Sequence, residues 1–149
     1  MIQIFVDADG CPVVNETISA AKKFSVPVTL ITDTAHIMNR EGATTITVEK
    51  GSDSADFRLV NLVQRGDVVI TQDYGLAAMA LAKGAHILNQ NGSRYTNENI
   101  DSLLMSRHIG KKIRRAGGRT KGPSKRTKEQ DERFVYALEA LIREILQIN

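Results

Sequence analysis

The sequence predicts an α/β protein, a three-layer α/β/α sandwich with a mainly parallel central sheet. Three observations lead to this prediction. Short apolar runs alternate regularly with amphipathic stretches, and the runs recur roughly every 20 residues, which leaves room for a helical crossover between parallel strands. The runs are apolar at consecutive positions, as expected for strands that helices cover on both faces.

Each element has its own signal in the sequence. Five apolar runs are the predicted strands, at residues 2–6, 26–32, 44–50, 67–71 and 85–89. The predicted helices lie between and after them, at residues 12–24, from 53 onward, 75–83, 97–109 and about 128–148. Pro12 suits the first turn of a helix, where its missing N–H costs nothing. Thr127 and Gln130 form a capping-box pattern that starts the last helix.

The apolar spacing predicts which helix faces are buried. We expect Val14, Ile18 and Ala21 to face the core from the first helix. The helix that opens at Asp53 should present Phe57, Val60 and Val63 inward, listed here by the same spacing argument.

Length and composition indicate one globular domain. The 149 residues are predicted to form a single domain over 1–149, with a basic loop at about 110–128 and the C-terminal helix after it. No apolar run approaches the roughly 20 residues needed to cross a bilayer. Cys11 is the single cysteine and is expected to fill space in the core. Because one cysteine fits a reducing interior and the N-terminus lacks a signal-peptide pattern, we expect a cytoplasmic protein.

Acidic residues follow two of the predicted strands. Asp7 and Asp9 come directly after the first strand, and Asp73 follows the fourth. In an open parallel sheet the carboxyl ends of the strands form the ligand-binding edge, so we expect these side chains to lie together. Asp53 and Asp56, at positions i and i+3 of a helix start, can point the same way. All five carboxylates are therefore predicted ligands of Mg²⁺ or Mn²⁺, which prefer oxygen donors.

Each acid also has a structural interpretation, which stays open at this point. Asp53 is a good N-cap, and Asp56 favours the dipole of the same helix. Asp73 can cap the helix that follows it, and Asp9 precedes a glycine as turn residues often do. Asp7 is the hardest to explain structurally, because it adjoins a buried strand and stands close to a second acid. Two such carboxylates repel each other unless a cation or a proton lies between them.

The positive charge is concentrated in one segment. The formal net charge is +3, but residues 107–128 hold 10 of the 20 lysines and arginines and no acid, which leaves −7 for the remainder. A local block of cations attracts a polyanion, although a solvated surface loop is the alternative. The residues predicted to bind nucleic acid are Arg107, Lys111, Lys112, Arg114, Arg115, Arg119 and Lys121.

Five stretches carry a resemblance to a known family. They are VDADGCPV (6–13), EKGSDSADF (49–57), GDVVITQDYGLAA (66–78), AKGAHILNQNG (82–92) and GPSKRTKEQDERF (122–134). Through them the whole chain resembles the YaiI/YqxD family of uncharacterised bacterial proteins. That family in turn resembles the PIN-like metal-dependent nucleases, which implies a PIN-like fold with acids after the first strand, at a central helix start and after the fourth strand. Asp7, Asp56 and Asp73 fall on those places, with Asp9 and Asp53 beside them.

The leading functional hypothesis is a metal-dependent nuclease that hydrolyses phosphodiester bonds, with RNA favoured over DNA. The expected catalytic residues are Asp7, Asp9, Asp56 and Asp73. Mg²⁺ or Mn²⁺ is the expected cofactor, since such an ion polarises a phosphoryl group and activates water.

Two alternatives remain. The DADG motif (7–10) resembles the nucleophile motif of haloacid-dehalogenase-like phosphatases, in which Asp7 would attack phosphorus while Thr32 and Lys50 would contact the phosphate. The other alternative is a non-catalytic nucleic-acid-binding protein whose acids hold a structural cation.

Overall fold

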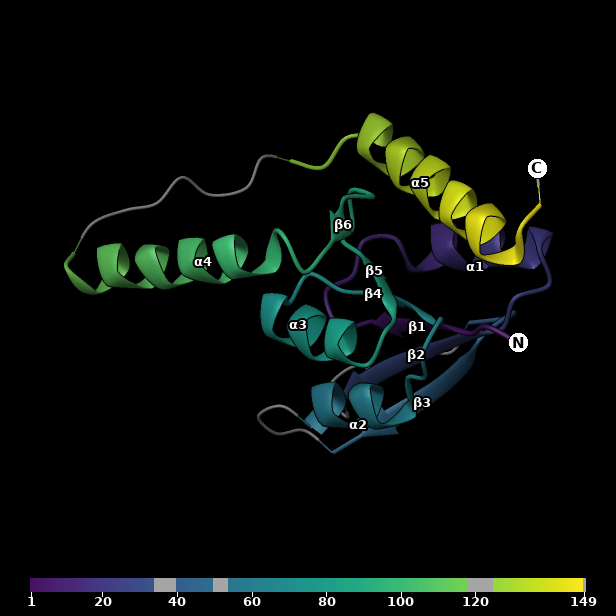
Figure 1. The fold of residues 1–149 in the computed structure, drawn as a ribbon, viewed down its shortest axis with the longest axis horizontal. Helices are drawn as coiled ribbons and strands as arrows, with labels where there is room; N and C mark the ends of the chain where they lie inside the picture. The colour runs from purple at the N-terminus through teal and green to yellow at the C-terminus, as the bar shows by residue number, and fades with distance from the viewer. Residues whose placement is uncertain (34–39, 50–53, 118–124, 149) are drawn as a thin grey trace.

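The computed structural model describes residues 1–33, 40–49, 54–117 and 125–148 (Figure 1). The strands found within these residues are β1 (Ile4–Asp7), β2 (Val28–Asp33), β3 (Thr44–Val48), β4 (Val68–Ile70), β5 (His86–Leu88) and β6 (Arg94–Tyr95). The helices are α1 (Val14–Lys23), α2 (Ser54–Leu62), α3 (Tyr74–Ala82), α4 (Ile100–Arg115) and α5 (Lys128–Leu146). None of these helices combines the length and the apolar character that a membrane crossing requires.

The strands form one sheet in the order β3-β2-β1-β4-β5-β6. Strands β1 to β5 are parallel, and only the short β6 pairs antiparallel, with β5. Ile4 of β1 pairs with Val28 on one side and with Val68 on the other. Because the chain moves from β1 to β2 in one direction and returns to add β4 in the other, the strand order reverses beside β1. Such a switch point opens a crevice at the carboxyl ends of β1 and β4.

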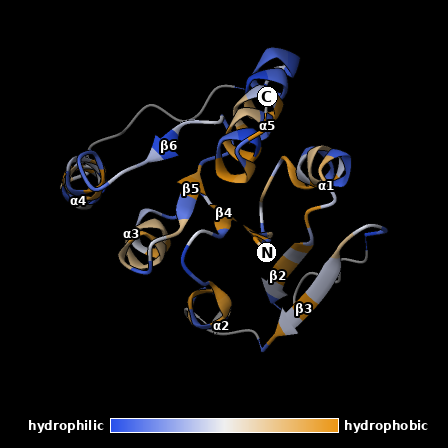
Figure 2. Cartoon of the chain, turned by 45° about the vertical axis from the view of Figure 1, so that its right-hand side comes forward, coloured by the Kyte–Doolittle hydropathy of each residue, from blue (hydrophilic) through white to orange (hydrophobic). Residues whose placement is uncertain are grey.

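Helices cover both faces of the sheet, which confirms the predicted three-layer sandwich. Helices α1 and α5 lie on one face, and α2 and α3 lie on the other with the first turns of α4 (Figures 1 and 2). Ile4 and Val6 of β1 point toward α1 and α5 and pack with Phe134. Phe5, between them, points to the opposite face and packs with Leu59. The period of two in a strand thus divides each central strand between two apolar cores.

Two elements differ from the sequence prediction. Phe57 is 58% exposed, whereas Leu59 and Val63 are 1% exposed and form the inward stripe of α2. Leu59 and Val63 are four positions apart and share a face, while Phe57 lies about 200° before Leu59 on the helix and points to solvent.

Helix α4 continues to Arg115, six residues past its predicted end at 109. Gly110 does not end it, because an isolated glycine costs a helix only about 1 kcal/mol. Residues 110–115 of the predicted basic loop are therefore helical. Beyond its contact with α3, α4 extends away from the body of the protein (Figure 1).

The start of α5 agrees with its predicted signal. The Thr127 side chain accepts a hydrogen bond from the Gln130 amide at 3.3 Å, and Gln130 Oε1 accepts one from the Thr127 amide at 2.8 Å. This reciprocal pair is a complete capping box and defines where the helix begins.

Candidate functional site

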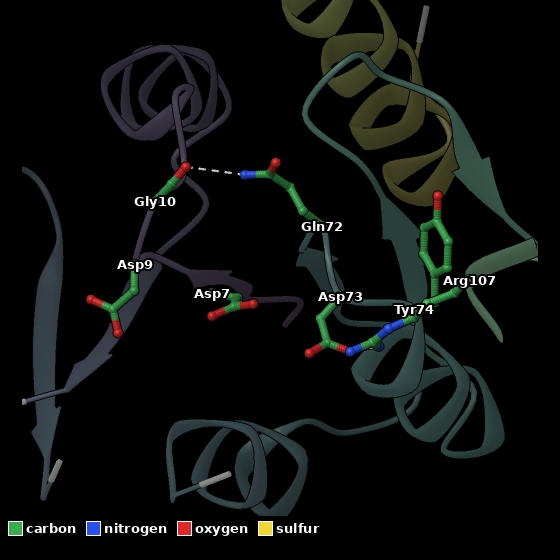
Figure 3. A pocket seen from close by; sticks show the side chains of 7 residues that line it. All are labelled: Asp7, Asp9, Gly10, Gln72, Asp73, Tyr74 and Arg107. Atoms are coloured by element: carbon green, nitrogen blue, oxygen red, sulfur yellow. Dashed lines mark hydrogen bonds and ion pairs between the residues drawn. The ribbon is translucent and has the colours of Figure 1, made fainter. Parts of the chain in front are cut away.

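Three of the predicted carboxylates line one cavity at the switch point of the sheet. The cavity has a volume of about 450 Å³, and its lining residues are Asp7, Asp9, Gly10, Gln72, Asp73, Tyr74 and Arg107. Figure 3 shows the side chains of Asp7, Asp9 and Asp73 directed toward the same space, with Asp7 between the other two. We call this cavity the acid pocket. It lies where the carboxyl ends of β1 and β4 meet, as the topology requires.

Hydrogen bonds from the neighbouring strand β2 orient Asp9. The hydroxyl group of Thr32, which is fully buried, donates to Asp9 Oδ1, and the amide of Asp33 donates to Asp9 Oδ2 at 2.9 Å. Asp9 therefore joins the loop after β1 to the end of β2, and its carboxylate has a defined direction.

Thr71, directly after β4, links the other two acids. Its hydroxyl donates to Asp7 Oδ2 at 2.8 Å and accepts from the backbone amide of Asp73 at 3.0 Å. Its carbonyl oxygen accepts from the Tyr95 hydroxyl at 3.3 Å. Burial raises the pKa of Tyr95 to about 12, so this phenol remains a donor at neutral pH. One buried threonine thus holds Asp7 and Asp73 at adjacent strand ends.

Asp73 has the capping role that its sequence position suggested. Its Oδ1 accepts a hydrogen bond from the Leu76 amide at 3.1 Å and caps the N-terminus of α3. The same oxygen lies 3.7 Å from Arg107 Nη1 of α4, in an ion pair whose side chains are both partly exposed. Because Asp73 also lines the acid pocket, capping does not exclude a role in ligand binding.

The electrostatics of the pocket favour a cation. Burial is the main cause that raises the pKa of Asp7, and repulsion from Asp73 and Asp9 raises it further, while the hydrogen bond from Thr71 acts in the opposite direction. The lining residues contribute three carboxylates and one guanidinium group. Their formal charge is therefore negative, and an added positive ion relieves the repulsion on Asp7.

The donor chemistry of the pocket suits a hard divalent ion. Among the described residues, no three His, Cys, Asp or Glu side chains lie close enough to bind one ion together. Mg²⁺, however, keeps several of its water ligands and is commonly bound by one or two carboxylates with a substrate phosphate. Asp7 with either of its acidic neighbours meets that requirement.

The remaining predicted acids lie elsewhere. Asp56, in the first turn of α2, lines an adjoining cavity of about 250 Å³ that shares Asp73 and Arg107 with the acid pocket. The structure thus brings Asp56 near the acid pocket but not into its lining. Asp53 is outside the described residues, as is Lys50 of the phosphatase alternative.

The basic segment begins at the acid pocket. Arg107 lines the pocket, and Lys111 follows it by one helical turn on α4. Lys112 is also exposed, and the backbone of Arg114 and Arg115 continues the helix. The other two predicted contacts, Arg119 and Lys121, are outside the described residues.

Comparison with known proteins agrees with the resemblance seen in the sequence. Residues 5–144 match the model of the family described as "Uncharacterized BCR, YaiI/YqxD family". The chain belongs to this family. A UPF0178 protein of Ruminiclostridium cellulolyticum is 56% identical over 142 residues, which cover 95% of this chain and 93% of that protein. A UPF0178 protein of Exiguobacterium sibiricum is 54% identical over 96% of this chain and 98% of its own length. No solved structure matches the chain at a significant level.

In this YaiI/YqxD chain, sequence reasoning missed the residues that position the acids. Thr71 and Gln72 were not singled out, and Thr32 was considered only as a phosphate contact. A signal for Thr71 was present, because Thr71 and Asp73 follow β4 with the same spacing as Asp7 and Asp9 at β1. The ion pair of Arg107 with Asp73 joins α4 to α3 across the chain, and no local pattern predicts it.

Cys11 is half-buried and packs against the core between α1 and α5. Burial raises the pKa of its thiol, and the nearby Asp7 acts in the same direction. The thiol is therefore held in its protonated form, as expected for a residue that fills space.

Proposed function

We propose that this protein is a metal-dependent phosphodiesterase that cleaves nucleic acid, with RNA favoured over DNA. The observation that carries the proposal is the acid pocket, in which three carboxylates from two adjacent strand ends face one cavity. Their mutual repulsion, reflected in the raised pKa of Asp7, is relieved by a bound cation. The resemblance of the family to PIN-like nucleases supports the same reading.

The chain supplies the groups that such a reaction needs. In the proposal, Asp7, Asp9 and Asp73 bind Mg²⁺ or Mn²⁺, with Asp56 contributing from the adjoining cavity. A divalent ion bound there would polarise the phosphoryl group and lower the pKa of a water molecule. Thr32 and Thr71 keep the carboxylates in position. Arg107 donates to a phosphate oxygen at the mouth of the pocket, because a guanidinium group matches the geometry of a phosphate.

The basic face of α4 provides contacts along the nucleic-acid backbone. Lys111 and Lys112 are exposed beyond Arg107, and α4 extends outward from the pocket (Figure 1). In the proposal, a strand whose phosphodiester lies in the acid pocket runs along this helix toward Arg119 and Lys121. Each phosphate that a lysine or arginine neutralises releases counterions and adds affinity without reading the base sequence.

The test combines metal binding with cleavage. Mn²⁺ affinity is measured by calorimetry for the wild type, for Asp7→Asn and for the control Asp101→Asn, whose carboxylate is exposed on the first turn of α4. We expect Asp7→Asn to weaken Mn²⁺ binding strongly and to abolish Mn²⁺-dependent cleavage of labelled RNA, and Asp101→Asn to do neither.

Three results would contradict parts of the proposal. Equal Mn²⁺ affinity in the wild type and Asp7→Asn would mean that the metal site is misassigned. Metal-dependent release of phosphate from small phosphomonoesters, without strand cleavage, would favour the phosphatase alternative. RNA binding without turnover, at any Mn²⁺ concentration, would favour the non-catalytic alternative.

A further inference from the structure

A second cavity adjoins the acid pocket on the same edge of the sheet. Its volume is about 360 Å³, and its lining residues are Gly10, Pro12, Gln72, Gln90, Asn91, Arg126 and Gln130. Four of these seven side chains are amides, so we call it the amide pocket. It shares Gly10 and Gln72 with the acid pocket. Gln72 Nε2 donates to the Gly10 carbonyl at 3.1 Å, and this bond is visible in Figure 3.

The loop that carries Gln90 is held in one conformation. It follows β5, so it lies one strand beyond the acids along the same edge. Asn89 Oδ1 accepts hydrogen bonds at 2.9 Å from the amides of Asn91 and Ser93. Gly92 has φ +82°, and a Cβ there would lie 2.8 Å from the Cβ of Ala137 in α5. The loop therefore packs against α5 too closely for any side chain at position 92.

Arg126 fixes the same loop from the other side. Its Nη2 donates to the Gln90 carbonyl at 2.6 Å, and its Nη1 donates to Asn91 Oδ1 at 2.8 Å. Its Nε donates to Asp131 Oδ1 at 2.6 Å, which ties the loop to the first turn of α5. Although Arg126 belongs to the basic segment by sequence, its guanidinium group serves as a clamp. The wall of the amide pocket is thus formed before any ligand binds.

The clamp engages the backbone of Gln90 but not its side-chain oxygen. Gln90 Oε1 is buried, and within the described part of the chain it has no hydrogen-bond partner. Buried amide oxygens are almost always hydrogen-bonded in folded proteins. A rigid loop that presents such an acceptor in a polar cavity is suited to a ligand with an N–H donor.

We infer that the amide pocket binds a nucleobase of the strand whose phosphodiester bond lies in the acid pocket. This inference rests on the proposed function for the identity of the strand. A glutamine amide can accept from an exocyclic amine and donate to a neighbouring ring nitrogen, as in its contact with adenine. The Watson–Crick edges of adenine and cytosine carry that pair of groups, whereas those of uracil and guanine do not. The pocket therefore favours adenine or cytosine beside the phosphate.

The test measures binding of mononucleotides, which needs neither metal nor cleavage. Dissociation constants for AMP, CMP, UMP and GMP are measured by NMR titration in EDTA for the wild type and for Gln90→Leu. Gln64→Leu is the control, because Gln64 is exposed before β4, at the opposite edge of the sheet. Gln90→Glu is a second variant, which keeps the acceptor and removes the amide donor. Melting temperatures establish that all four proteins are folded.

We expect the wild type and Gln64→Leu to bind AMP and CMP at least about fivefold more tightly than UMP and GMP, the low end of one bidentate contact. Gln90→Leu should lose this preference, and Gln90→Glu should weaken it. A preference that persists in Gln90→Leu, or no preference in the wild type, would overturn the inference.

The outcome separates this inference from the proposed function. Base binding that depends on Gln90, in a protein without cleavage activity, would support the amide pocket and refute the nuclease. Cleavage that depends on Asp7, with the same base preference in Gln90→Leu and wild type, would support the nuclease and refute the amide pocket.

Discussion

Replacing Asp7 by asparagine should leave the metal-free protein as stable as the wild type or make it more stable. Asp7 Oδ2 accepts the hydroxyl of Thr71 at 2.8 Å, and an asparagine oxygen can accept the same hydrogen bond. The bond loses its charge assistance, at a cost of about 1 kcal/mol. The substitution also removes a buried charge that Asp73 and Asp9 repel, and this gain opposes the loss.

Asp7→Ala is the matched comparison. It removes the same charge but leaves the buried hydroxyl of Thr71 without its acceptor. An unsatisfied buried group costs about 1–3 kcal/mol, which corresponds to a melting temperature lower by about 2–12 °C for a chain of this size. The two variants therefore separate the charge of Asp7 from its hydrogen bond.

The pH dependence has a definite sign. Because the folded-state pKa of Asp7 is raised above 3.8, the favourable contribution of the protonated group is present below the unfolded pKa and is lost as the pH rises through the folded pKa. The gain from Asp7→Asn in EDTA should therefore be larger at pH 7 than at pH 4.

Differential scanning calorimetry, in EDTA and in Mn²⁺, measures all of these effects. At a Mn²⁺ concentration 100 times the dissociation constant, the wild type should gain about 2.7 kcal/mol, or about 5–11 °C, and Asp7→Asn should lose most of this gain. If Asp7→Asn melts as far below the wild type in EDTA as Asp7→Ala does, Asp7 has a structural hydrogen-bonding role and the reasoning fails.

Three further predictions follow from the ion pair, the basic segment and the loop after β5. Arg107→Gln should raise Mn²⁺ affinity by up to about fivefold, the value of an exposed ion pair, and should weaken RNA binding; calorimetry showing unchanged Mn²⁺ affinity would contradict this. Gly92→Ala should lower the melting temperature by several degrees, because a left-handed conformation costs alanine about 1–2 kcal/mol before any clash with α5, and an unchanged temperature would contradict the close packing. A quadruple alanine variant should make the slope of log K against log salt shallower by up to about 2.8 for single-stranded RNA in fluorescence anisotropy, with Mn²⁺ binding intact, and an unchanged slope would mean that the segment faces away from the substrate. Its four sites are Lys112, Arg114, Arg115 and Arg119.

The central strands and the convergence of three acids could be predicted from the sequence because both depend on local rules. Apolar runs of four to seven residues separated by helical patterns specify a parallel sheet, and a parallel sheet brings its carboxyl ends to one edge. Asp7, Asp9 and Asp73 needed only that geometry. Strand β6 was missed because Arg94–Tyr95 is two residues long and has no apolar run of its own.

The contacts around the acids required the tertiary structure. Thr71 joins acids from β1 and β4, and Arg126 joins the loop after β5 to α5 over a sequence distance of about 35 residues. Hydrogen bonds of this range depend on how helices pack on the sheet, which periodicity does not encode. Phe57 illustrates the same limit, since its neighbours Leu59 and Val63 fit the core of α2 and its own ring does not.

Asp67 shows what a structural acid looks like in this fold. It is 5% exposed at the amino edge of the sheet, where Oδ1 accepts the Gln3 amide at 3.0 Å and Oδ2 accepts the Gln64 amide at 2.9 Å. Both oxygens thus satisfy buried backbone donors, and Asp67→Asn should cost about 1–3 kcal/mol because its NH₂ group would face an N–H. Asp7 instead faces two other acids, which raise its pKa. Asp67→Asn should therefore lower the melting temperature in EDTA and leave Mn²⁺ affinity intact, the reverse of Asp7→Asn; if both variants behave alike by calorimetry, the acid pocket has no role beyond that of Asp67.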